Sequence, residues 1–178
     1  PEGTVTLPAL WNTVKCLDQV LDVDYYIPGC PPPVKLILDG LTAILEGKLP
    51  PKGSTLAPSL ALCSECHLRD TKPEKLAIKE FKRPHQVMVD PDTCLLAQGL
   101  LCLGPATRAG CGSACIKGNM PCTGCLGPTD QVVDYGAKAM SGLASLVGSN
   151  EPDEIAKILD GIVDPVGTFY RFSLPASL

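Results

Sequence analysis

Residues 94–125 read CLLAQGLLCLGPATRAGCGSACIKGNMPCTGC and follow a CSEC motif at residues 63–66. Together these segments hold eight of the ten cysteines, in the order C-x2-C, x27, C-x7-C, x8, C-x3-C, x6, C-x2-C. The series divides into two sets of four, and four thiolates are the ligand set of one cubane iron–sulfur cluster. We therefore predict that residues 62–129 form a domain that holds two [4Fe-4S] clusters.

The residues between the cysteines suit this chemistry. A thiolate is the soft ligand that iron and sulfide prefer, and a C-x2-C turn places two sulfurs on one side of a tight loop. Glycines let the backbone approach a cluster closely and direct N–H groups at its sulfides, while prolines stiffen the loops. The residues of these two kinds in or beside the loops are Gly104, Gly110, Gly112, Gly118, Gly124, Gly127, Pro105, Pro121 and Pro128.

Three other interpretations compete for the cysteines. An even number of cysteines is compatible with disulfides, but the cysteine content is below that of short disulfide scaffolds, and C-x2-C pairs close loops too short to stabilise a fold strongly. Structural zinc fits paired C-x2-C motifs, but the intervening spacings differ and only His67 and His85 could contribute nitrogen. Plain buried thiols leave the clustering unexplained. A structural zinc-binding adaptor without a redox role stays as the alternative function.

Composition limits the remaining function classes. A net charge of −4 and a pI near 5.1 disfavour a nucleic-acid partner. The 178 residues include 17 glycines and 18 prolines but only 4% aromatics, which predicts a loop-rich protein with a modest core. No apolar run reaches the ~18 residues of a membrane helix, and no signal-peptide pattern opens the chain. Cysteines that stay reduced indicate a cytoplasmic location.

The N-terminal third is predicted to be of the α/β type. Residues Val20–Ile27 alternate between apolar and acidic side chains, which predicts a strand. A helix over Val34–Glu46 is expected to start after Pro33 and to stop at Gly47.

Cys30 lies in the intervening loop, beyond the carboxyl end of the predicted strand, where ligands often bind in α/β folds. It is therefore a candidate metal ligand, whereas nothing around Cys16 resembles a ligand loop.

The rest of the chain carries no recognisable acid–base pair, phosphate loop or nucleophile triad. Trp11 is expected to be a buried anchor or a partner contact. The predicted domains are 1–50, a linker at 51–61, the cysteine domain at 62–129, and C-terminal helices with a docking tail at 130–178. The predicted helices after the linker cover 73–81, a stretch beginning near Thr93, 130–147 and a stretch opened by Asn150, followed by an irregular apolar tail over 164–178.

Several motifs resemble the small subunit of cytoplasmic [NiFe] hydrogenases of the methyl-viologen-reducing, deazaflavin-non-reducing type found in methanogenic archaea. They span most of the chain and are VDYYIPGCPPP (23–33), CSEC (63–66), CLLAQGLLCLGPATRAGC (94–111), MPCTGC (120–125) and GTFYRFSLPAS (167–177). The resemblance implies that residues 1–50 are the last strand and helix of a flavodoxin-like domain. The preceding part of that domain, with its own C-x2-C motif, is not in this sequence.

The resemblance also implies a ligand assignment. Cys30 corresponds to the last ligand of a proximal [4Fe-4S] cluster that the chain shares. Cys63, Cys66, Cys94 and Cys102 correspond to a distal cluster, with Cys63 where many relatives have histidine. The medial ligands are Cys111, Cys122 and Cys125, and Cys115 offers a fourth thiolate where many relatives have proline and a [3Fe-4S] cluster, so we predict a medial [4Fe-4S] cluster.

The implied function is electron transfer within an oxidoreductase complex of methanogenesis. The chain would pass electrons from H2 oxidation in a [NiFe] large subunit to an acceptor such as a heterodisulfide reductase complex, with no bond chemistry of its own. A free-standing ferredoxin-like carrier is disfavoured, because the half-domain and the apolar tail both need a surface to dock against.

Overall fold

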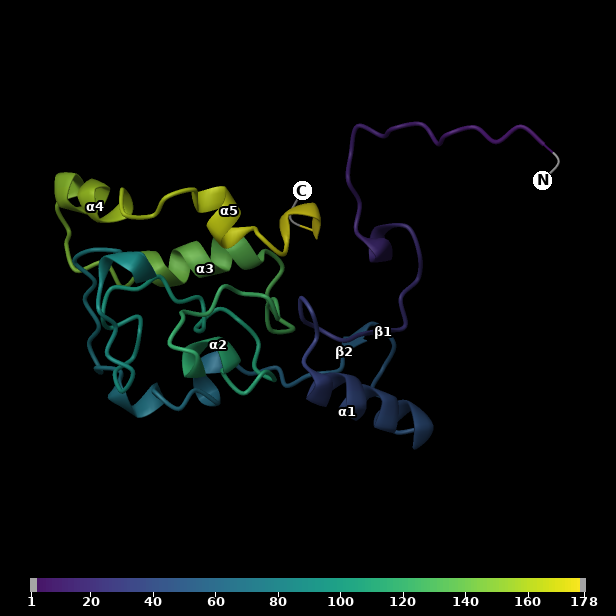
Figure 1. The fold of residues 1–178 in the computed structure, drawn as a ribbon, viewed down its shortest axis with the longest axis horizontal. Helices are drawn as coiled ribbons and strands as arrows, with labels where there is room; N and C mark the ends of the chain where they lie inside the picture. Colours follow the sequence, from purple (N-terminus) through teal and green to yellow (C-terminus); the bar gives the residue numbers. More distant parts are fainter. Residues whose placement is uncertain (1–2, 177–178) are drawn as a thin grey trace.

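The computed structural model describes residues 3–176 and sets short helices and one small sheet in long loops (Figure 1). The strands and α-helices are β1 (Tyr25–Tyr26), α1 (Val34–Leu45), β2 (Ser54–Thr55), α2 (Ala114–Lys117), α3 (Tyr135–Ala144), α4 (Pro152–Leu159) and α5 (Pro165–Phe169). Short 3-10 turns lie at Leu17–Gln19, Leu62–Ser64, Arg69–Thr71, Pro84–Gln86 and Leu174–Ala176. This architecture is compatible with an α/β element followed by a loop-rich, mostly helical domain. Within residues 3–176, no helix combines the length and the apolar character that crossing a membrane requires.

The sheet is smaller than the sequence predicts. The strand expected over residues 20–27 is reduced to β1, which pairs in parallel with β2 through Tyr25–Ser54 and Tyr26–Thr55. Pairing stops there because β2 itself has only two residues and Pro28, which lacks an N–H, follows soon after β1. The strand β2 lies inside residues 51–61, the predicted linker, so this segment is tied to the α/β element by backbone hydrogen bonds.

Helix α1 forms where the sequence predicts a helix. Pro33 is its N-cap residue, and Gly47 follows the C-cap with a φ of +65°, its N–H donating to Ile44 O at 3.2 Å. Only a narrow face is buried, at Leu36 and Gly40, where a Cβ on Gly40 would lie 3.0 Å from the Ile27 side chain. Other large apolar residues of this helix are exposed, among them Ile37, Leu41, Ile44 and Leu45.

The core lies among the cysteine loops, and two predicted helices there are wrong. Residues 73–81 are bends and irregular backbone instead, with one isolated bridge at Ile78, whose N–H donates to Leu146 O at 2.7 Å and whose carbonyl accepts from Gly148 N–H at 2.8 Å. The stretch after Thr93 is a series of turns, such as Ala97 N–H to Cys94 O. Leu95, Leu96 and Leu100 of this stretch are nevertheless buried, and the other buried aliphatic residues of the region include Leu62, Leu68, Ile78 and Leu103.

The C-terminal helices cover one side of this core (Figure 1). The Asp134 carboxylate caps α3 by accepting from Ala137 N–H at 2.9 Å. Helix α4 forms in the predicted stretch but begins at Pro152, and its N-cap is Glu151 rather than Asn150. The tail is not wholly irregular, because Asp164 caps α5 through Gly167 N–H at 2.9 Å. Phe169 of α5 is 3% exposed, so the tail docks on the core, and residues 177–178 of the predicted tail lie outside the described part.

The N-terminal segment leading to the first 3-10 turn runs away from the rest of the fold (Figure 1). Trp11 in this segment is 70% exposed, so the prediction of a buried anchor is wrong. Its ring is contacted by Lys15, whose Nζ lies 5.9 Å from the ring centroid. The apolar residues on either side of Trp11 are exposed as well, so this segment forms no core in which the ring could be buried.

Substitutions at two glycines of α3 test how the C-terminal tail packs on this helix. A Cβ on Gly136 would lie 2.3–2.5 Å from the Tyr170 ring, whereas a Cβ on Gly142 would meet nothing within 4 Å. We expect Gly136→Ala to lower the free energy of unfolding by about 1–3 kcal/mol through overpacking. The matched control Gly142→Ala should raise it by up to ~1 kcal/mol, because alanine favours the helix more than glycine does. Anaerobic thermal unfolding of the full chain measures both, and equal effects would contradict the packing of Tyr170 on α3.

Candidate functional site

All ten cysteines are free thiols, and two of the first four in the cysteine domain, Cys63 and Cys102, lie beside Gly104. Cys63 lies within electrostatic range of Cys66 and Cys94 and also of Cys122, and Cys102 lies within range of Cys63 and Cys94. A Cβ on Gly104 would lie 3.5 Å from Cys63 Sγ and 3.6 Å from Cys102 Sγ. The structure therefore brings together Cys63, Cys66, Cys94 and Cys102, the four residues predicted as one ligand set.

The other four cysteines of this region line a common cavity. Cys111, Cys115, Cys122 and Cys125 share its wall with Leu62, Thr107, Ser113 and Ile116. Cys125 interacts electrostatically with Cys115 and Cys111, and Cys122 interacts with Cys125. Cys115 is exposed whereas Cys122 is buried, so the cavity reaches from the core to the surface. This is the second predicted ligand set, and it includes Cys115.

Backbone N–H groups point at the sulfurs of both groups. Cys102 Sγ accepts from Cys122 N–H at an N···S distance of 3.4 Å and also from the amide of Gly104. The amide of Gly124 is directed at the Cys122 thiol. The Cys122–Cys102 contact joins the two groups, because a ligand candidate of one group donates to a ligand candidate of the other. Glycine is required at position 124, where φ is +95° and a Cβ would lie 2.3 Å from Tyr135 Oη.

Burial keeps these thiols neutral when no metal is bound. Burial raises the pKa of Cys102 to about 11 and that of Cys122 to about 12, and it also raises the pKa of Cys63 and of Cys125. The N–H donors oppose this shift by stabilising the thiolate. A bound cationic centre would displace the protons, since the thiolate is the form that ligates metal.

A carboxylate that sequence reasoning missed connects the two groups. Glu65 lies inside the C-x2-C motif of the first group, and its Oε1 accepts from the N–H groups of Gly110 and Gly112 at 2.9 Å each. These glycines flank Cys111 of the second group. The carboxylate thereby fixes the distance between two cysteine loops that are far apart in sequence. An acidic residue between two cysteines is the only signal that the sequence offers for this role.

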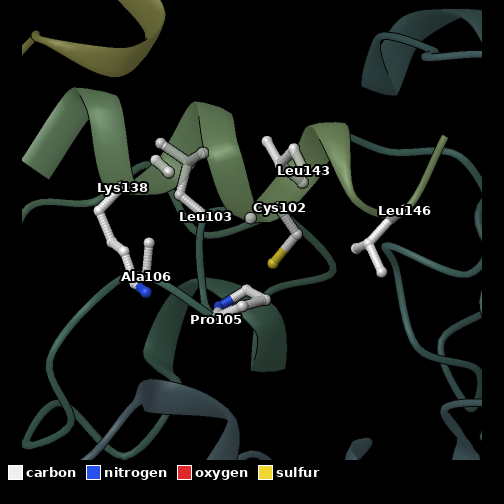
Figure 2. A pocket seen from close by; sticks show the side chains of 9 residues that line it. Cys102, Leu103, Pro105, Ala106, Lys138, Leu143 and Leu146 are labelled. Carbon is white, nitrogen blue, oxygen red and sulfur yellow. The ribbon is translucent and has the colours of Figure 1, made fainter.

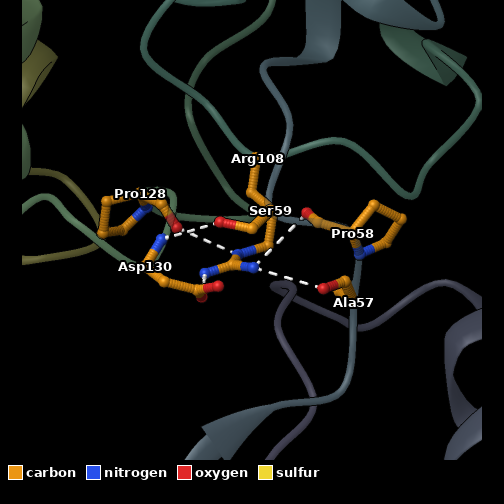
Figure 3. Close-up of polar contacts among 6 residues, drawn as sticks. All are labelled: Ala57, Pro58, Ser59, Arg108, Pro128 and Asp130. Atoms are coloured by element: carbon orange, nitrogen blue, oxygen red, sulfur yellow. Dashed lines mark hydrogen bonds and ion pairs between the residues drawn. The ribbon is translucent and has the colours of Figure 1, made fainter.

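Arg108 is a second residue that the sequence did not identify. Its side chain is 3% exposed and forms an ion pair with Asp130. Its Nε donates to Pro128 O at 2.9 Å, and its Nη1 lies 3.3 Å from both Ala57 O and Pro58 O (Figure 3). A guanidinium with several fixed donors suits this task. It ties the segment after β2 to the chain that leaves Cys125.

Cys30 lies beside the second group. Its backbone N–H is directed at the Cys125 thiol, while its own side chain is exposed. The preceding Gly29 has a φ of +138°, and a Cβ there would lie 2.4 Å from Pro32 Cα, so this turn requires glycine. Cys16 is placed elsewhere, next to Tyr26, and His67 and His85 are not buried. The order in space is therefore Cys30, the second group and then the first group.

Helix α3 covers the loop that carries Cys102. Figure 2 shows Cys102, Leu103 and Pro105 on this loop, facing Leu143 of the helix. The lining of the small space between them is almost entirely apolar. Helix α3 therefore limits access of water to Cys102 from this side.

A site for a single metal ion differs from a site for a cubane cluster. In the part of the chain that the structure describes, no three side chains of histidine, cysteine, aspartate or glutamate are grouped so that they could bind one ion. In a cubane, by contrast, each of the four thiolates binds a different iron.

Comparison with known proteins identifies relatives over nearly the whole chain. The iron-sulfur G subunit of the F420-non-reducing hydrogenase from Archaeoglobus profundus is 40% identical over 182 residues, which cover 99% of this chain and 55% of that protein. The corresponding G subunit from Methanothermobacter marburgensis is 43% identical over 97% of this chain and 55% of its own length. The G subunit from Methanothermus fervidus is 47% identical over 120 residues, covering 64% of this chain and 91% of that protein.

The chain belongs to the G subunits of F420-non-reducing hydrogenases. This confirms the resemblance found in the sequence motifs. The chain spans about 55% of the length of the first two relatives. No family model matches the sequence.

The residues of this hydrogenase chain fit an iron–sulfur cluster in the second group. The cavity offers four thiols as soft donors, and Ser113 opens into it with a buried hydroxyl that has no hydrogen-bond partner among the described residues. A buried hydroxyl without a partner costs about 1–3 kcal/mol, so a sulfide or thiolate acceptor would explain its position. The first group fits through its four thiols and through Gly104, whose missing side chain leaves room beside two sulfurs.

The clamp made by Arg108 gives a prediction about the stability of this hydrogenase chain. Arg108→Met removes three donors to main-chain carbonyls and should lower the free energy of unfolding by about 2–3 kcal/mol. Asp130→Asn should cost less than about 1 kcal/mol, because the Asp130 side chain is 56% exposed and the ion pair is screened. Denaturant titrations of the two variants beside the parent chain measure this difference.

The ion pair between Arg108 and Asp130 predicts that the stability of the chain depends on pH. Arg108 holds the pKa of Asp130 below its usual value. The carboxylate therefore contributes stability at neutral pH, and this contribution is lost as the pH falls below about 4. Asp130→Asn should flatten this part of the stability profile, and an unchanged profile would contradict the ion pair.

Proposed function

We propose that this chain is an electron-transfer subunit that holds two [4Fe-4S] clusters and one ligand of a third. The observation that carries the proposal is the sorting of eight thiols into two groups of four, joined by the 3.4 Å contact from Cys122 N–H to Cys102 Sγ. Such clusters supply one-electron acceptors at closely spaced positions. The family is compatible with this role, since the Archaeoglobus profundus relative is named an iron-sulfur subunit.

The proposed ligand assignment follows the two groups. Cys30 is the proximal ligand that this chain contributes, in a site whose other ligands lie outside this sequence. The distal ligands are Cys63, Cys66, Cys94 and Cys102, and the medial ligands are Cys111, Cys115, Cys122 and Cys125. The adjacency of Cys30 to Cys125, and of Cys122 to Cys102, supports the order proximal, medial, distal.

The residues around the thiols would hold the centres and exclude water. Leu62, Leu95 and Leu100 are at most 2% exposed, and they keep the local dielectric low. The N–H groups of Gly104, Cys122 and Gly124 offset negative charge on the sulfurs. Arg108 and Glu65 hold the loops in place, so the groups keep a fixed separation. Electron transfer with little reorganisation needs such rigidity.

The partners are proposed from the family. The electron donor would be the [NiFe] large subunit, where H2 is oxidised, and the acceptor a protein such as a heterodisulfide reductase complex. The chain itself would do no bond chemistry, in keeping with the lack of a recognisable catalytic triad or acid–base pair in the sequence. A cytoplasmic location is proposed because the thiols are free.

Metal analysis distinguishes this function from a structural zinc protein. The anaerobically prepared subunit should contain close to eight irons and eight acid-labile sulfides per chain, apart from any proximal share, because each group of four thiols binds one cubane. The preparation should be brown and should bleach with dithionite. Zinc without labile sulfide, in a colourless protein, would end the proposal.

The role of Cys115 has its own test. Cys115→Ala removes the exposed thiol of the second group and should convert one cluster to a [3Fe-4S] form, visible by EPR in the oxidised state, with about one iron fewer per chain. The matched control is Cys16→Ala, which should leave the spectrum and the iron content unchanged. An unaltered spectrum in Cys115→Ala would reject Cys115 as a ligand.

A further inference from the structure

Two buried hydroxyl groups face the second cysteine group. Thr107 and Ser113 are each 1% exposed, and both line the cavity formed with Cys111, Cys115 and Cys122. A threonine at the rim of the same cavity, Thr123, is exposed to solvent. Because the first two side chains are shielded from bulk solvent, we expect their protons to be directed at groups inside the protein or inside the cavity.

The Ser113 hydroxyl is a donor for which residues 3–176 offer no acceptor. Its Oγ makes no hydrogen bond among the described residues. The residue is the N-cap of α2 but forms no side-chain cap, and its φ is +55°, in the left-handed region. A serine at this position would ordinarily cap the helix. Its strained backbone and unused hydroxyl together point to an acceptor in the cavity itself.

Thr107 is the centre of a hydrogen-bond relay. Its Oγ1 lies 2.6 Å from Leu103 O, 2.8 Å from Tyr135 Oη and 3.6 Å from Cys122 Sγ. The hydroxyl has one proton and three neighbours. Leu103 O already accepts from the N–H groups of Ala106 and Thr107, at 3.1 and 3.0 Å, so it does not depend on the Thr107 hydroxyl.

The relay has a defined direction once Cys122 is a ligand. A ligating thiolate carries no proton and can only accept, so Thr107 donates to Cys122 Sγ. The hydroxyl of Tyr135, 2.8 Å away, then donates to Thr107 Oγ1, because the single proton of Thr107 is used in its bond to sulfur. Donation from Tyr135 polarises the Thr107 hydroxyl and strengthens its bond to sulfur.

We propose that Thr107 and Ser113 donate hydrogen bonds to the sulfur atoms of the second centre and make its reduction potential more positive, with Tyr135 as the positioning residue for Thr107. Reduction adds negative charge, which donors on sulfur stabilise. This inference rests on the proposed function, because it requires a cluster in the second group. It adds residues that lie outside the cysteine motifs and that ligate nothing.

The test is a redox titration of the subunit within its anaerobically purified complex, followed by EPR. Thr107→Val and Ser113→Ala each remove a hydroxyl and should shift the midpoint potential of one cluster in the negative direction. The other cluster should not move. Thr107→Ser keeps the hydroxyl and should restore the parent potential. The matched control Thr123→Val removes an exposed hydroxyl at the rim of the same cavity and should leave both potentials unchanged.

Iron and sulfide content is measured on the same samples, so that failure of the proposed function can be distinguished from failure of this inference. A parent protein without iron and labile sulfide would defeat the proposed function. Loaded Thr107→Val and Ser113→Ala variants with parent potentials would defeat this inference alone. If Thr107→Val does not load iron, Tyr135→Phe decides, because it removes only the proton donated to Thr107. If Tyr135→Phe shifts the midpoint potential in the negative direction, by less than the loss of a direct donor does, the relay is supported. An unchanged potential overturns it.

Discussion

The fold depends on keeping eight thiols inside loops that have almost no regular secondary structure. Backbone groups in such loops need partners, and several find them in sulfur, as Cys122 N–H does with Cys102 Sγ. Burial alone would oppose ionised thiols, as the pKa of about 12 for Cys122 shows. The N–H donors and a bound cationic centre act in the opposite direction, so packing and metal binding are coupled.

The two cysteine groups behave as one unit because three contacts cross between them or hold their loops. Glu65 bonds the amides on both sides of Cys111, Cys122 donates to Cys102, and Arg108 ties the chain leaving Cys125 to the segment after β2. These contacts fix the two groups relative to each other. These long-range contacts hold the loops together, as a larger sheet or helix bundle does in other folds.

Local patterns in the sequence predicted the parts of the structure that depend on local chemistry. Helix α1 with its proline and glycine boundaries follows from such local signals, and so does the existence of α4. The predictions of a strand over residues 20–27 and of a helix over 73–81 were wrong. The conformation of these segments depends on distant partners, β2 and Val147. The roles of Glu65, Arg108 and Thr107 depend on contacts across the fold, which no residue pattern in one chain reveals.

The proposed second centre combines two opposing influences on its potential. A fourth thiolate from Cys115 adds negative charge to the centre and favours the oxidised state, whereas the buried hydroxyls of Thr107 and Ser113 stabilise the charge that reduction adds. Cys115 is exposed and both hydroxyls are fully buried, so water screens the first influence more than the second. We therefore expect the two buried hydroxyls to influence the potential of the centre more strongly, relative to the charge that they face, than the exposed thiolate does.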